Sequence, residues 1–178
     1  HIISGPSRVF NTLIVSPPQC GKTTILRDIA RSISNGVPEL GFEGKKVGIV
    51  DERSEIAAYY KGSPQNDVGI RTDVLDSCPK RLGMAMLIRS MSPQVIITDE
   101  IGDEGDREAI MSVLNAGIKL ITTAHGYNIS ELRSRREVLR LIEDKVFERY
   151  IVLGKQKGPG TVVEVIDGNT MKPLALGV

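Results

Sequence analysis

Short apolar runs recur along the chain, and their spacing predicts the strands of a buried sheet. The runs lie at residues 13–15, 46–51, 94–100, 119–124 and 149–153. Runs with almost no polar interruption are typical of parallel sheets, because both faces of such a sheet are covered. The sequence therefore predicts a central, mostly parallel sheet.

The segments between these runs have apolar residues at helical spacing. They lie at residues 25–33, 84–91, 109–114 and 138–146. Strands that alternate with helices form parallel α/β sheets with right-handed crossovers. Residues 161–166 follow a glycine-rich turn and are expected to return as an antiparallel strand, which gives a C-terminal hairpin.

The length of 178 residues fits one domain with a short additional segment. Residues 1–11 contain Ser, Gly and Pro, and we expect them to be a remnant of an N-terminal region or a linker. Residues 12–178 are expected to form the domain itself. Residues 60–77 are polar and have no clear period, which predicts a long loop with a functional role.

Composition narrows the classes of partner. The chain has 23 basic and 22 acidic residues, so its net charge of +1 gives no electrostatic footprint for nucleic acid. No apolar run reaches the roughly 18 residues that span a bilayer, and no signal peptide is evident. Two cysteines form no disulfide framework, which favours a cytoplasmic protein.

Residues 12–28 contain the motif on which the functional prediction depends. A strand leads through a turn into Gly21-Lys22-Thr23-Thr24 at the start of a helix. This spacing fits the phosphate-binding loop G-x-x-x-x-G-K-[ST], the Walker A motif, although Ser16 stands where the first glycine usually lies. The residues expected to hold phosphate are Ser16, Pro17, Pro18, Gln19, Cys20, Gly21, Lys22, Thr23 and Thr24.

Each part of this loop has a physical role in binding ATP with Mg²⁺. Backbone N–H groups at a helix N-terminus attract anions. Lys22 would add a positive charge beside the β- and γ-phosphates, and the Thr23 hydroxyl would be a ligand of Mg²⁺. For Cys20, a space-filling role is favoured over redox chemistry.

Polar residues also follow three other predicted strands. Asp99 and Glu100 end the strand 94–100, as in a Walker B motif, in which Asp holds Mg²⁺ and Glu can deprotonate the attacking water. Asp51 and Glu52 begin a charged cluster after the second strand. His125 follows the strand 119–124 and is either a γ-phosphate sensor or a structural histidine. These residues should meet at one sheet edge.

Six segments together carry a resemblance to a known family. They are SPPQCGKTTILRDIAR, VGIVDERSEI, DVGIRTDVLDSCPK, LIRSMSPQVIITDEIG, TTAHG and FERYIVL. The sequence closely resembles the ATPase domain of the stage III sporulation protein AA family, which is related to the motor ATPases of type II secretion and type IV pilus systems. The resemblance implies a P-loop NTPase fold of the RecA/AAA-like type that hydrolyses ATP with Mg²⁺.

The resemblance also implies roles for individual residues. In the secretion motors an acidic box follows the second strand, and Asp51-Glu52 matches its position. A histidine box follows the fourth strand, at the place of Thr122-Thr123-Ala124-His125. Arginines ahead of the Walker B strand act across the subunit boundary in those motors. Arg89 matches that place, and Arg71 is a second candidate.

The sequence departs from the motor pattern at two positions. The motors usually have Gly where Asp99 stands, and they have Arg where Gly102 stands. These departures leave open whether Glu100 or Glu52 is the general base, and we favour Glu100.

The resemblance further implies a cytoplasmic, hexameric ATPase on the mother-cell side of a membrane. Its partners would be membrane-embedded channel or secretion platform proteins of the sporulation complex, with no nucleic acid. Three alternatives stay open. Because Ser16 replaces the usual first glycine of the loop, the protein could also be a nucleotide-gated assembly subunit that hydrolyses little ATP. A small-molecule kinase would need residues 60–77 as a lid, and a nucleic-acid translocase finds no support in charge or aromatic content.

Overall fold

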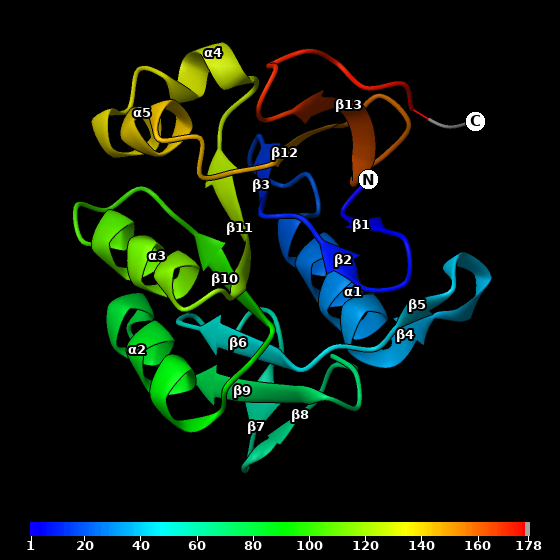
Figure 1. Ribbon diagram of the computed structural model, residues 1–178, viewed down its shortest axis with the longest axis vertical. Coiled ribbons are helices and arrows are strands. Elements are labelled where there is room, and N and C mark those ends of the chain that lie inside the picture. Colours follow the sequence, from blue (N-terminus) through cyan, green and yellow to red (C-terminus); the bar gives the residue numbers. More distant parts are fainter. Residues whose placement is uncertain (177–178) are drawn as a thin grey trace.

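The computed structural model describes residues 1–176, and a seven-stranded sheet forms its centre (Figure 1). The strand order is β13-β12-β3-β11-β10-β6-β9, and only the β12–β13 pair is antiparallel. The strands are β3 (Thr12–Ser16), β6 (Val47–Asp51), β9 (Thr72–Asp76), β10 (Val95–Glu100), β11 (Lys119–His125), β12 (Arg149–Gly154) and β13 (Thr161–Asp167).

This order separates the two strands that end in the predicted motifs. β3 leads into the phosphate-binding loop, β10 ends at Asp99 and Glu100, and β11 pairs with both of them. The predicted parallel α/β sheet with a C-terminal antiparallel hairpin is confirmed.

Helices cover both faces of the sheet (Figure 1). The helix α1 (Lys22–Asn35) lies on one face, where Leu26, Ala30 and Ile33 are buried. The other face carries α2 (Lys80–Ser90), α3 (Asp106–Asn115), α4 (Ile129–Leu132) and α5 (Arg136–Glu143). Adjacent strand residues face opposite layers, so Leu13 packs in one apolar cluster and Ile14 in the other.

Several short elements lie outside the central sheet. They are the pairs β1 (Ile3–Ser4) with β2 (Arg8–Val9), β4 (Gly36–Val37) with β5 (Phe42–Glu43), and β7 (Tyr59–Tyr60) with β8 (Ser63–Pro64), and the 3-10 helix η1 (Pro38–Leu40). Within residues 1–11, Val9 and Phe10 are buried. A domain boundary at residue 12 stays a prediction. Among residues 1–176, no helix combines the length and apolar character that a membrane span requires.

The prediction of one long loop over residues 60–77 was wrong. This stretch contains β8 and the edge strand β9, which pairs in parallel with β6. All five residues of β9 are only partly buried, and two of them are Asp. An edge strand with one open side needs no continuous apolar run, which explains why the pattern did not indicate it.

Two glycines bring α2 close to β6. A methyl group added at Gly83 of α2 would lie 2.5 Å from Val50 Cγ1, and one added at Gly48 of β6 would lie 2.8 Å from Leu87 Cδ1. The close approach matters for function, because α2 begins at Lys80, beside the carboxyl end of β10.

We expect Gly83→Ala to destabilise the domain. In an exposed helix this change stabilises by about 1 kcal/mol, but overpacking a buried contact costs about 1–3 kcal/mol. Urea unfolding should therefore show a net loss of about 1 kcal/mol in the free energy of unfolding. The loss should disappear in a Val50→Ala background, and an equal loss in both backgrounds would contradict the packing explanation.

Candidate functional site

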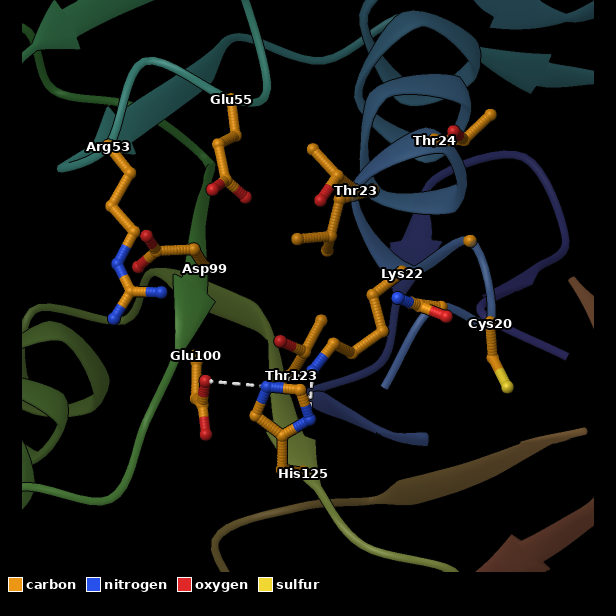
Figure 2. Close-up of a pocket in the computed structure, with 13 residues that line it drawn as sticks. Cys20, Lys22, Thr23, Thr24, Arg53, Glu55, Asp99, Glu100, Thr123 and His125 are labelled. Atoms are coloured by element: carbon orange, nitrogen blue, oxygen red, sulfur yellow. Dashed lines mark hydrogen bonds and ion pairs between the residues drawn. The ribbon is translucent and has the colours of Figure 1, made fainter. Parts of the chain in front are cut away.

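The carboxyl ends of β3, β6, β10 and β11 surround a cavity of about 340 Å³ (Figure 2). The lining residues come from the phosphate-binding loop, the turn after β6, and the ends of β10 and β11. They are Gln19, Cys20, Gly21, Lys22, Thr23, Thr24, Leu26, Arg53, Glu55, Asp99, Glu100, Thr123 and His125. The expectation that the motifs meet at one sheet edge is therefore confirmed for Lys22, Asp99, Glu100 and His125.

The loop between β3 and α1 opens the N-terminus of α1 into this cavity. Gln19 and Gly21 both adopt left-handed backbone conformations, with φ of 59° and 78°. The first turn of α1 has no acidic residue, so its positive end is not neutralised from within the helix. Cys20 is buried, and its carbonyl oxygen accepts a hydrogen bond from the Gly160 N–H at 2.9 Å, which ties the loop to the β12–β13 turn.

Three of the predicted loop residues do not line this cavity. Ser16 is buried in β3, where its hydroxyl donates to the Pro17 carbonyl oxygen at 2.9 Å. Pro17 and Pro18 line a separate cavity of about 620 Å³, which the tip of β12 also borders. The direct contacts to a bound anion are thus available from residues 19–24.

Lys22, His125 and Glu100 form a continuous polar chain across the cavity (Figure 2). The Lys22 ammonium lies 2.6 Å from His125 Nδ1 and 2.8 Å from Nε2, and Nε2 lies 3.0 Å from Glu100 Oε2. A neutral imidazole satisfies both neighbours when Nε2–H donates to Glu100 and Nδ1 accepts from Lys22. Burial lowers the pKa of Lys22, and the charge of Glu100 opposes this shift.

Asp99 is a mostly buried carboxylate at the end of β10. Burial raises its pKa to about 6, and the nearby Lys80 ammonium, 3.8 Å away, only partly opposes this. A carboxylate that is poorly solvated without a cation is well suited to accept one.

The turn after β6 places Glu55 in the cavity, whereas Glu52 lies outside it. Asp51 is fully buried, and its two carboxylate oxygens accept backbone N–H groups of Glu55, Ile56 and Ala57 at 2.8–3.0 Å. Asp51 therefore shapes the turn. Glu52 lies 3.8 Å from Lys80 and lines a smaller cavity of about 190 Å³.

Sequence reasoning missed Glu55, Arg53 and Lys80 as members of this region. Glu55 and Arg53 belong to the charged run 51–55, so the run itself was the signal that could have identified them. Which acid of such a run reaches the cavity depends on how the turn folds. Lys80 had no local signal, since it meets its partners only through packing.

The two predicted trans arginines lie away from this cavity. Arg71 precedes β9, and its guanidinium donates to the Ser34 carbonyl oxygen at the C-terminal end of α1. Arg89 is an exposed residue in the last turn of α2, while the first turn of that helix adjoins the site. Neither residue lines the cavity of its own chain.

Groups that could bind phosphate and groups that could hold a hydrated divalent cation line the same cavity. Figure 2 shows Thr23 and Lys22 on one side of it, and Glu55 and Asp99 on the other. Within residues 1–176, no group of three His, Cys, Asp or Glu residues is arranged to hold a metal ion alone. Mg²⁺ usually keeps several waters and takes few protein ligands besides phosphate oxygens, so this arrangement suits it.

Known proteins match most of this chain in sequence. The family model described as "Sporulation stage III, protein AA" matches residues 2–172. Stage III sporulation protein AA of Bacillus subtilis (strain 168) is 52% identical over 164 residues, which cover 91% of this chain. The chain belongs to the stage III sporulation protein AA family. The family assignment made from the six segments is therefore confirmed. The match covers 53% of the Bacillus relative, so this chain spans about half of that relative's length.

Solved structures with the same fold are secretion ATPases. The ATPase DotB of Legionella pneumophila has a TM-score of 0.57 and 18% identity, over 80% of this chain and 40% of that chain. The VirB11 ATPase from the Brucella suis type IV secretion system, in complex with sulphate, has a TM-score of 0.53 and 12% identity, over 91% of this chain and 49% of that chain. These similarities establish that this chain has the fold of those ATPases.

We expect Asp99→Asn to raise the free energy of unfolding of the nucleotide-free protein near neutral pH. The folded-state pKa of Asp99 is about 6 rather than 3.8, so the ionised carboxylate weakens the fold. This loss of folding stability is absent below the pKa of Asp99 in the unfolded chain and complete above its pKa in the folded protein. The gain from Asn should therefore grow between about pH 4 and pH 6.5, to at most about 3 kcal/mol.

Urea unfolding of both proteins across this pH range measures the difference. A gain that does not change with pH would contradict the assignment of the titration to Asp99.

Proposed function

We propose that this domain binds ATP with Mg²⁺ in the 340 Å³ cavity and hydrolyses it to ADP and phosphate. The observation that carries the proposal is the chain Lys22–His125–Glu100, which joins the phosphate-binding loop to a carboxylate across the same cavity. A phosphate-binding group and a base on opposite sides of one space is what hydrolysis of a terminal phosphate requires.

In this proposal the backbone of residues 19–24 and the N-terminus of α1 bind the phosphates. Lys22 neutralises charge on the β- and γ-phosphates, and Thr23 and Asp99 hold the hydrated cation. When bound, Mg²⁺ would supply positive charge that stabilises the negative charge developing on the phosphates. These residues mainly position and stabilise the reacting groups.

Glu100 acts as the general base. It takes a proton from water while the water oxygen forms a bond to the γ-phosphorus, the bond from that phosphorus to the bridging oxygen breaks, and ADP leaves. His125 holds the Glu100 carboxylate at 3.0 Å. A γ-phosphate attracts the Lys22 ammonium, and in this proposal that attraction draws Lys22 away from the imidazole and makes His125 a sensor of the γ-phosphate.

Glu100 is favoured over the other acids by its position. Glu52 lies outside the cavity, and Glu55 lies inside it but makes no contact to His125. We therefore assign Glu100 as the base and Glu55 as a second acid that orients water or the cation.

The remaining parts of the proposal concern assembly. Arg53 is one arginine that lines the cavity, while Arg71 and Arg89 are distant from it. In this proposal an arginine from a neighbouring subunit completes the site, and arginine fingers contribute roughly 10³–10⁵ in rate. We infer a homohexameric ring in the cytoplasm on the mother-cell side, which energises membrane-embedded secretion or channel proteins during sporulation.

A second candidate is a nucleotide-gated assembly subunit with little hydrolysis. The contact between the Glu100 carboxylate and His125 favours this candidate, because a carboxylate that accepts a hydrogen bond from His125 is less free to accept a proton from water. The two candidates differ in phosphate release when ATP is saturating.

Glu100→Gln is expected to lower ATP turnover by roughly 10²–10⁴-fold while ATP binding persists, because the amide cannot accept the proton. Phosphate release and binding of a fluorescent ATP analogue measure the two effects. Glu52→Gln serves as the matched control and should keep most of the activity. If Glu52→Gln is the more damaging change, the assignment of the base is wrong. If the wild type binds ATP and releases no phosphate at any protein concentration, the assembly subunit replaces the ATPase.

Subunit mixing tests the arginine in trans. Arg89→Ala and Lys22→Ala should each be inactive alone, because one lacks the donated arginine and the other lacks the phosphate-binding lysine. Mixed rings should recover activity, since a Lys22→Ala subunit can donate its intact Arg89 to a neighbour with an intact loop. A mixture of Arg71→Ala with Lys22→Ala subunits tests Arg71 in the same way. The mixture that recovers activity identifies the arginine that acts in trans. No recovery in either mixture would exclude both residues.

A further inference from the structure

Lys80 is a buried lysine that lies beside the site without lining the 340 Å³ cavity. It is the first residue of α2 and only 8% exposed. Its ammonium donates a hydrogen bond to the Glu100 carbonyl oxygen. It also lies within 3.7–3.8 Å of the carboxylates of Glu52, Asp99 and Asp106. The turn after β6, the end of β10 and the start of α3 thus converge on one cation.

This position is unfavourable for a cation that has no compensating partners. The first turn of a helix is its positive end, and burial disfavours a charged ammonium. The three carboxylates offset both costs, and they would repel one another if the ammonium were absent. Lys80 is therefore the counter-ion of an acidic cluster formed by Glu52, Asp99 and Asp106.

The hydrogen bond of Lys80 falls where β10 leaves regular pairing. The β10–β11 register shifts between Ile97 and Glu100, which marks a bulge at the end of the strand. At this bulge the Thr122 hydroxyl donates to the Asp99 carbonyl oxygen, and Lys80 donates to the carbonyl oxygen of the next residue. Bulges next to functional sites re-aim side chains, so whatever fixes the bulge fixes where those side chains point.

We propose that Lys80 is a positioning residue that fixes the bulged end of β10 and thereby directs Asp99 and Glu100 into the cavity. It acts through the Glu100 backbone and the Asp99 carboxylate, from the 190 Å³ cavity behind them. The effect on turnover rests on the proposed function. The effect on the order of β10 does not, since it concerns the nucleotide-free protein.

The test compares Lys80→Met with Lys46→Met and Lys80→Arg. Lys46 is the control, because it is also a lysine paired with an aspartate, Asp73. Its side chain is 48% exposed and lies just before the start of β6, at the end of that strand away from the site. Hydrogen–deuterium exchange of residues 98–103 without nucleotide is the first measurement. Lys80→Met should exchange these amides roughly tenfold faster or more, while Lys46→Met and Lys80→Arg stay near wild type.

ATP affinity and turnover are the second measurement. Lys80→Met should bind ATP within about twofold of wild type, because Lys80 lies outside the main cavity. Its turnover should fall by roughly 10–100-fold, the usual loss when a partner of a metal-site carboxylate is removed. Lys80→Arg should restore most of the turnover, which a purely space-filling role would not predict.

Unchanged exchange of residues 98–103 in Lys80→Met would overturn the inference. An equal loss of ATP affinity and turnover would also overturn it, since that result indicates general damage to the site. If Lys80→Met does not fold, Lys80→Gln removes the charge while keeping a donor, and the same exchange criterion applies. If the wild type shows no hydrolysis, the proposed function fails, and the exchange data alone decide the role of Lys80.

Discussion

The position of β11 between β3 and β10 is the constraint on which the rest of the site depends. Neighbouring strands lie about 4.8 Å apart, so the two outer strands end about 10 Å apart. This gap separates the predicted phosphate-binding loop from the acidic end of β10. His125 ends the middle strand, paired in register with Ser16, and its imidazole joins the two sides. Strand order thus sets the separation between the Lys22 ammonium and the proposed base Glu100, which flexible loops could not hold as well.

The acids at this edge divide into two groups by what their oxygens contact. Asp51 and Asp106 accept backbone N–H groups, from Glu55, Ile56 and Ala57 in one case and from Gly102 and Asp103 in the other. Their charges are used to fold the turns. Asp99, Glu100 and Glu55 instead line the cavity. One set of carboxylates therefore builds the frame that presents the other set to a ligand.

The sequence predicted the parts of this structure that have a local cause. Apolar runs identified the five buried core strands, and the G-K-T spacing after β3 identified the start of α1 and the loop that lines the cavity. The strand β9 (Thr72–Asp76) was not predicted, because an edge strand needs no continuous apolar run. The choice of Glu55 over Glu52 depends on how Asp51 folds the turn, and Lys80 meets its carboxylates only after α2 packs on β6. Contacts made by distant segments leave no periodic trace in a sequence.

The hydrogen bond between Gly160 and Cys20 has a mechanical consequence. It joins the turn of the β12–β13 hairpin to the phosphate-binding loop, at the end of the sheet where β13 is the terminal strand. Gly160 has φ of 85°, and a methyl group added there would lie 3.4 Å from Ile25 Cδ1, so the turn packs closely against α1. A displacement of this turn would therefore also move the Cys20 backbone, so the position of the loop before α1 depends on the hairpin at the far edge of the sheet.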